Sequence, residues 1–198
     1  METNRLEAFS DGVLAIIITV MVLELKRPGG SSLHSLWQDS HLSLLTYLLS
    51  FVYVGIYWNN HHHLFQLCGR ITGGVMWANL HLLFWLSLYP FTTDWMDEKH
   101  LAATPTVVYG VNLLGAAIAY TILQRLLVNQ PDTGAQLREA LGADFKGKLS
   151  PVLYLAGIGL CFVQPWLGLI PFAMVAGIWL IPDRRVERYL RAQGTSTS

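Results

Sequence analysis

The stretch that decides the fold runs from Arg5 to Leu23 and reads R-L-E-A-F-S-D-G-V-L-A-I-I-I-T-V-M-V-L. A charged cluster that ends at Asp11 leads directly into an uninterrupted apolar run from Gly12 to Leu23. An ionisable side chain in a membrane helix costs roughly 2.5 to 3.5 kcal/mol on insertion scales, so it normally faces protein or water and marks a functional position. We therefore expect Asp11 to have a partner inside the protein.

Composition assigns the chain to the integral membrane proteins. Of its 198 residues, 53% are hydrophobic and 13% are charged, and the mean hydropathy is +0.40, whereas a soluble domain has about 25% charged residues. The net charge is zero and no basic run occurs, which argues against nucleic-acid binding. Cys68 and Cys161 lie far apart in apolar surroundings, so we interpret them as small buried hydrophobic residues.

Apolar segments predict an all-α fold with six transmembrane helices, at residues 8–26, 42–67, 73–95, 105–128, 150–164 and 167–181. The last two segments are predicted to form a hairpin, because one helix from Pro151 to Ile181 would be about 46 Å long, against a hydrocarbon core of about 30 Å. The turn signal Gln164-Pro165-Trp166 favours the same division. Residues 1–193 are then a single six-helix transmembrane domain, and 194–198 form a flexible polar tail.

The distribution of basic residues supports six helices with both termini in the cytoplasm. Three basic residues fall on the outer side in this arrangement: Lys26, Arg27 and Lys99. Ten fall on the inner side: Arg5, Arg70, Arg125, Arg138, Lys146, Lys148, Arg184, Arg185, Arg188 and Arg191. With five helices, the four C-terminal arginines would lie on the outer side, and the excess of basic residues on the inner side would be lost.

Two connections are predicted to have secondary structure of their own. The outer loop at 27–41 begins with Pro28-Gly29-Gly30 and predicts a turn followed by an interfacial helix. The inner connection at 129–148 spaces Leu137, Leu141 and Phe145 four apart, as a short helix on the membrane surface would.

The first helix has two different faces. At about 100° per residue, its large apolar side chains lie within about 60° of one line; this stripe consists of Phe9, Val13, Ile16, Val20 and Leu23. Thr19 lies on the shoulder of the stripe, and Asp11 lies about 140° away from its line. Periodicity alone leaves open whether the stripe is an ordinary helix-packing surface or lines a pore.

A second group of polar residues lies near the inner ends of the second and third predicted helices. The second helix carries Trp58-Asn59-Asn60-His61-His62-His63, and the third carries Asn79 and His81. The predicted topology puts them on the same side as Arg5 and Asp11, so a histidine could donate to Asp11. Trp58 and His61 share a helical face, whereas His62 and His63 point elsewhere.

Three consecutive histidines do not predict a metal site, because successive residues diverge around a helix and cannot close on one ion. A proton relay through Asp11 and the histidines stays open as an alternative. No G-x-S-x-G, H-E-x-x-H, phosphate-loop or dinucleotide fingerprint occurs, so we expect neither an enzyme nor a cofactor. The T-V-G-Y-G potassium filter is absent as well.

Several motifs resemble the transmembrane protein 175 potassium channels in their prokaryotic single-repeat form. They are R-x-x-x-F-S-D-G at Arg5–Gly12, A-I-I-I-T at Ala15–Thr19, W-x-x-H at Trp58–His61 with Leu64-Phe65 after it, and Asn79-Leu80 followed by Pro90. The resemblance implies a homotetramer of six-helix subunits in the plasma membrane, in which the first helices line the pore and potassium is the permeating ion.

By position, the resemblance implies a hydrophobic constriction at Ile16, followed outward by Val20 and Leu23, with Thr19 as the selectivity layer. It also implies a structural polar network, formed by Arg5, Phe9, Ser10, Asp11, Trp58, His61 and Asn79. The function expected is passive cation conduction that modestly prefers potassium over sodium. The alternatives are a proton-coupled transporter or proton-conducting protein that uses Asp11 and the histidines, and a structural membrane protein without ion flux.

Overall fold

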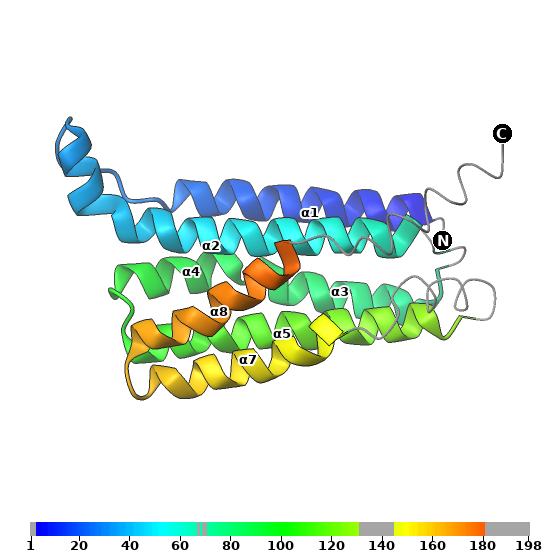
Figure 1. Ribbon diagram of the computed structural model, residues 1–198. Helices are drawn as coiled ribbons and strands as arrows, with labels where there is room; N and C mark the ends of the chain where they lie inside the picture. Colours follow the sequence, from blue (N-terminus) through cyan, green and yellow to red (C-terminus); the bar gives the residue numbers. More distant parts are fainter. Residues whose placement is uncertain (1–2, 67, 69–70, 131–144, 181–198) are drawn as a thin grey trace.

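The computed structural model describes residues 3–66, 68, 71–130 and 145–180, and every regular element in these ranges is an α-helix. The helices are α1 (Thr3–Leu23), α2 (Leu33–Gln66), α3 (Gly73–Ser87), α4 (Tyr89–Glu98), α5 (Ala103–Val128), α7 (Phe145–Cys161) and α8 (Pro165–Leu180). Figure 1 shows α1 beside α2, with α3 and α4 following each other along α5, and α7 and α8 joined as a hairpin. The prediction of an all-α membrane fold is confirmed.

Three of these helices are each long and apolar enough to cross a membrane, namely α1, α2 and α5. The apolar helix α8 is shorter, with 16 residues. The segment predicted as one helix at 73–95 is divided at Leu88, and its second part extends to Glu98. The physical reason is Pro90, which has no N–H for helical hydrogen bonding and therefore favours a new helix start.

The second helix begins at Leu33, nine residues before its predicted start, so the segment predicted as an interfacial helix is continuous with it. Ser32 caps this start, since its Oγ accepts a hydrogen bond from Ser35 N–H at 3.0 Å. Figure 1 shows the first turns of α2 at an angle to the rest of the helix.

The predicted hairpin of the last two segments is present as α7 and α8. Pro165 is the first residue of α8, where its fixed φ suits a helix start. The two helices approach closely at Gly168, since a Cβ there would lie 2.8 Å from Gly157 O. Phe145 is the first residue of α7, whereas Leu137, Leu141, Arg138 and the tail at 194–198 lie outside the described residues.

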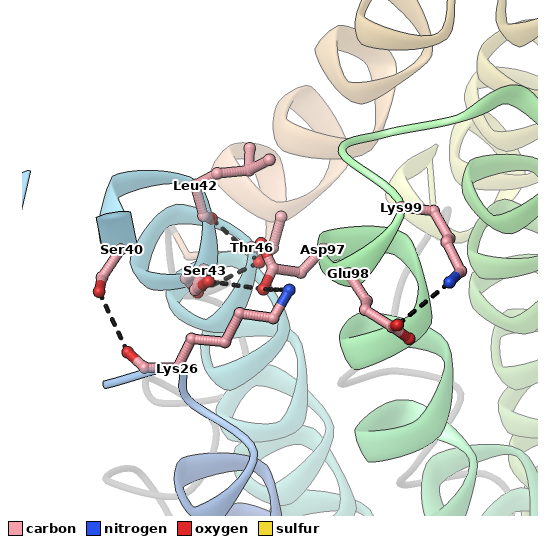
Figure 2. A network of polar contacts seen from close by, with 8 residues as sticks. All are labelled: Lys26, Ser40, Leu42, Ser43, Thr46, Asp97, Glu98 and Lys99. Atoms are coloured by element: carbon pink, nitrogen blue, oxygen red, sulfur yellow. Dashed lines mark hydrogen bonds and ion pairs between the residues drawn. The ribbon is translucent and has the colours of Figure 1, made fainter. Parts of the chain in front are cut away.

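The end of the bundle opposite the N-terminus is held by the carboxylate of Asp97 (Figure 2). Ser43 of α2 donates a 2.5 Å hydrogen bond to Asp97 Oδ2, and Lys26 Nζ lies 3.7 Å from the same oxygen. Ser40 Oγ donates to the carbonyl of Lys26 at 3.0 Å. The segment that follows α1 is therefore tied to both α2 and α4.

A second ion pair at this end is confined to neighbouring residues. Lys99 Nζ donates to Glu98 Oε1 at 3.0 Å, and this hydrogen bond lowers the pKa of the exposed Glu98 carboxyl (Figure 2). Such solvent-exposed pairs add little to stability. The buried Asp97 is therefore the residue that connects the helices here.

Candidate functional site

The first helix buries one face against the other helices of the chain. The buried residues of α1 are spaced three or four apart: Leu6, Ser10, Leu14, Ile17 and Met21. This spacing is that of a single helical stripe. The stripe packs against the core and leaves the rest of α1 at the surface.

The apolar stripe predicted from the sequence lies on the surface of the helical bundle. Ile16 is 63% exposed and Leu23 is 80% exposed, and Phe9 and Val20 are exposed as well. Val13 is only partly buried against the core. A row of exposed branched aliphatic side chains has to be covered by lipid or by another protein chain, or has to line a water-filled path.

A groove runs beside this stripe, between α1 and the start of α4. Val13, Ile16 and Val20 line it from α1, and Pro90 and Phe91 line it from α4. Glu24 and Asp94 also line the groove. Since Glu24 follows the end of α1, these carboxylates lie near the end of the subunit that Asp97 holds, and the apolar residues occupy the middle of the membrane helix.

Thr19 is exposed on the same side of α1. Its hydroxyl donates to the carbonyl of Ile16, one turn earlier, at 2.8 Å. This bond uses the only proton of the hydroxyl but leaves lone pairs on Oγ1. Thr19 can therefore present an acceptor to the surroundings of α1 while its donor stays satisfied.

Three buried polar side chains connect α1, α2 and α3. Asn79 Nδ2 donates to Ser10 Oγ at 2.9 Å, and Asn79 Oδ1 lies 2.8 Å from His61 Nε2. Ser10 in turn donates to Leu6 O at 2.9 Å within α1. All three side chains are at most 1% exposed, so this connected chain constrains how α1 can rotate in the subunit.

The partner of Asp11 differs from the expected one. Trp58 Nε1 donates to Asp11 Oδ1 at 3.1 Å, whereas a histidine was the donor expected from the sequence. The reason is geometric: His61 faces the buried interior, where it bonds to Asn79, and Asp11 lies at the half-exposed edge of α1. Trp58 is exposed and can reach it.

The remaining predicted residues lie around this chain. Arg5 and Phe9 are on exposed positions of α1, and among the described residues no ion pair involves Arg5. His81 accepts a 3.0 Å hydrogen bond from Trp85 Nε1 on its own helix. No group of three or more metal-ligating side chains comes together in the described ranges.

Sequence reasoning missed a side-chain hydrogen bond between α1 and α2. His62 Nδ1 lies 2.5 Å from Glu7 Oε1, although His62 was expected to point away from the network. A usable signal was present, because Glu7 and Asp11 on one helix and Trp58 and His62 on the other both have the spacing i, i+4. When two neighbouring helices each carry polar residues at positions i and i+4, hydrogen bonds can form between them at two successive turns.

The fold and the surface of α1 define a class of protein: the chain is a multi-pass integral membrane protein, and its regular elements in the described ranges are all helices. Residues 5–90 match the family described as "Endosomal/lysosomal potassium channel TMEM175". A relative named as a potassium channel from Chryseobacterium sp. (strain P1-3) is 51% identical over 96% of this chain and 99% of its own length. The chain therefore belongs to the TMEM175 family of ion channels and is not an enzyme.

Solved structures agree with this assignment. The crystal structure of a lysosomal potassium-selective channel TMEM175 homolog from Chamaesiphon minutus is 32% identical, and the match covers 91% of this chain and 97% of that chain with a TM-score of 0.75. A second solved potassium channel, 15% identical with a TM-score of 0.55, supports the fold alone.

We predict that Asn79→Ala lowers the free energy of unfolding by about 1–3 kcal/mol, because it leaves the buried Ser10 and His61 without their shared partner. Asp11→Ala should cost less, since its bond to Trp58 lies at an exposed position. Asn59→Ala is the matched control, because Asn59 is exposed on α2. Thermal unfolding of the detergent-solubilised chain measures the three shifts. Equal shifts for Asn79→Ala and Asn59→Ala would contradict the prediction.

Proposed function

We propose that the chain forms a potassium channel in the plasma membrane, with a central pore lined by the α1 helices of four copies. The observation that carries this proposal is the exposed aliphatic stripe of α1, with Ile16 63% exposed, on a helix whose buried face, about 100° around the axis, is fixed in its own subunit. Relatives named as potassium channels support it, including one from Chamaesiphon minutus that is 36% identical over 84% of this chain.

In the proposed arrangement both termini are cytoplasmic. The start of α1 and the end of α5 lie at one end of the bundle (Figure 1), so Arg5 and Arg125 share that end. Lys26 lies at the other end, beside Asp97. This separation agrees with the excess of basic residues expected at the cytoplasmic side.

The proposed gate is a ring of Ile16 side chains, with Val20 and Leu23 continuing the apolar passage outward. No residue of the stripe carries a charge, so water inside a narrow passage of this kind has no hydrogen-bond partner. Such constrictions block ions by losing their water, and they conduct when they widen or become polar.

Selectivity in this proposal comes from hydration and not from a ring of carboxylates. Thr19 is the one hydroxyl on the shoulder of the stripe, and its donor is already used by Ile16 O. Four Oγ1 atoms with free lone pairs could replace water around a cation that passes the apolar ring. We expect a modest preference for potassium over sodium.

The polar network has a structural role in this proposal. Ser10, His61 and Asn79 fix the rotation of α1 from the buried side, and Asp11 with Trp58 fixes its edge. Arg5 and Phe9, at exposed positions in the first turns of α1, belong to the same structural network in this proposal. None of these residues needs to touch the permeating ion, because they lie at the inner end of α1 or off its stripe.

Proton conduction is the second candidate function. Animal relatives carry the name "Endosomal/lysosomal proton channel TMEM175"; the mouse protein is 28% identical over 87% of this chain, which spans 36% of that relative's length. Ionisable residues of the inner end, Glu7, Asp11 and the histidines, would be the proton carriers.

Flux through liposomes that contain the purified chain separates the candidates. A channel for potassium gives flux that follows the imposed potassium gradient and needs no proton gradient. Proton conduction gives acidification that follows the proton gradient and is unaffected when potassium is replaced by a large organic cation. The absence of both fluxes from a correctly folded, reconstituted chain would contradict a channel function.

We predict that Ile16→Asn raises potassium flux and weakens ion discrimination, because an amide on each copy wets the narrowest ring. Each 1.4 kcal/mol removed from the barrier raises the rate about tenfold. Val22→Asn is the control, since Val22 is exposed on α1 but lies about 120° from Ile16. An assembled Ile16→Asn channel with wild-type flux and selectivity would exclude Ile16 as the gate.

We predict that Thr19→Val lowers the permeability ratio of potassium to sodium, because it keeps the side-chain shape and removes the oxygen. The reversal potential under bi-ionic conditions measures this ratio. Thr121→Val is the matched control, since the Thr121 hydroxyl bonds its own helix at Ala117 O with the same 2.8 Å length but lies on α5. An unchanged reversal potential in Thr19→Val would exclude Thr19 from ion selectivity and leave it only the hydrogen bond to Ile16 O within α1.

A further inference from the structure

The turn between α7 and α8 is apolar and exposed. Phe162 and Val163 are each 75% exposed, and Trp166, in the first turn of α8, is 52% exposed. The sequence from 149 to 182 contains no Asp, Glu, Lys, Arg or His. The other two connections at this end of the bundle, 24–32 and 99–102 (Figure 1), carry ionisable residues: Glu24, Lys26, Arg27, Lys99 and His100. The α7–α8 turn therefore lacks the charges that hold a loop in water.

The backbone donors of this turn need no water. The N–H groups of residues 162–164 donate to Gly159 O or Leu160 O, with lengths between 2.9 and 3.2 Å. Pro165, the next residue, has no N–H to satisfy. Within a membrane, backbone polar groups have to be bonded inside the protein, because hydrocarbon offers them no partner. The donors of the α7–α8 turn meet this condition, so the turn can lie among lipids.

The turn ends below the level at which α5 begins. Gly110 of α5 and Ile158 of α7 lie at the same height, since a Cβ on Gly110 would be 2.8 Å from Ile158 Cγ1. From Gly110 to Ala103, the first residue of α5, the helix rises about 10 Å, whereas from Ile158 to Phe162 it rises about 6 Å. The turn thus stops about 4 Å short of the start of α5. The charged connection at 99–102 precedes that start and lies farther out.

Lipid fits this surface better than a second copy of the chain does. The hairpin of α7 and α8 packs mainly on α5 and α2, whereas α1 packs mainly on α2, α3 and α4 (Figure 1). If copies meet around α1, as proposed above, the hairpin lies at the outer rim of the assembly. The composition of the turn agrees with this position, because tryptophan is enriched where acyl chains meet headgroups, and Phe162 and Val163 are apolar.

We infer that the α7–α8 turn inserts into the phospholipid leaflet at the end of the bundle held by Asp97; the choice of lipid over a second copy rests on the proposed function. Phe162, Val163 and Trp166 occupy the boundary between acyl chains and headgroups. The indole N–H of Trp166 can donate there to lipid oxygens while its ring stays in an apolar environment. The membrane itself therefore holds the hairpin, and the connections at 24–32 and 99–102 lie in water.

Spin labels on cysteine variants of the full chain, in phosphatidylcholine liposomes, test this inference. Oxygen reaches labels among acyl chains, whereas a polar nickel chelate stays in water. The label on Val163→Cys should be relaxed more by oxygen than by the chelate, as on Leu155→Cys, an exposed position within α7. Ser31→Cys, in the connection at 24–32, is the aqueous control and should show the reverse order. The unsubstituted chain gives the background, since Cys68 and Cys161 are buried.

Two results would overturn the inference. Stronger relaxation of the Val163→Cys label by the chelate would place the turn in water, and protection from both reagents would place another protein chain over it. Phe162→Cys repeats the test at a second exposed position if thermal unfolding shows that Val163→Cys does not fold. The measurement needs no ion flux. Loss of potassium flux from the unsubstituted chain would therefore count against the proposed function and leave the lipid contact to the spin labels.

Discussion

The hydrogen-bond chain from Ser10 through Asn79 to His61 fixes the rotation of α1 about its own axis. A helix surrounded by apolar side chains could turn by tens of degrees with little change in buried area, because Leu, Ile and Val are nearly interchangeable in such packing. A buried amide that bonds two helices at once allows one orientation only, since any rotation leaves polar atoms unpaired. The choice of which residues α1 exposes therefore depends on one asparagine of α3.

Polar contacts hold α1 at its two ends but not in its middle. Ser10, Asp11 and Glu7 bind the N-terminal end of α1 to α2 and α3, and Lys26 ties the segment after α1 to Asp97. Between these ends, Leu14, Ile17 and Met21 pack without directional bonds. Apolar packing tolerates small shifts better than hydrogen bonds do. Movement of the helix is thus expected to be a bending or sliding of its central turns.

The sequence predicted a helix closely where hydrophobicity alone decides, as for α5, which was expected at 105–128 and spans Ala103–Val128. The first helix was expected at 8–26 but spans Thr3–Leu23, because its polar first turns carry no hydrophobic signal. Sequence reasoning missed the interruption at Leu88 because Pro90 lies in an apolar run that looks continuous, and it began α2 too late because the polar first turns resemble a loop. The grouping of Asp11, Trp58, His61 and Asn79 at one end followed from topology. Their individual bonds did not, because whether His61 or Trp58 reaches Asp11 depends on helix rotation and tilt that no spacing determines. The pair of Glu7 and His62 was hidden for the same reason.

The length of α2 sets a relation between the protein and the thickness of the bilayer. Its 34 residues correspond to about 51 Å at about 1.5 Å per residue, against a hydrocarbon core of about 30 Å. The excess is accommodated by the angled first turns, where Leu33 and Trp37 are 84% and 65% exposed. A tryptophan prefers the level of the lipid headgroups. Lipids with longer chains would therefore draw these turns toward alignment with the rest of α2, and shorter ones would let them lie flat on the membrane surface. Hydrophobic mismatch thus acts on the N-terminal turns of α2 before it reaches α1.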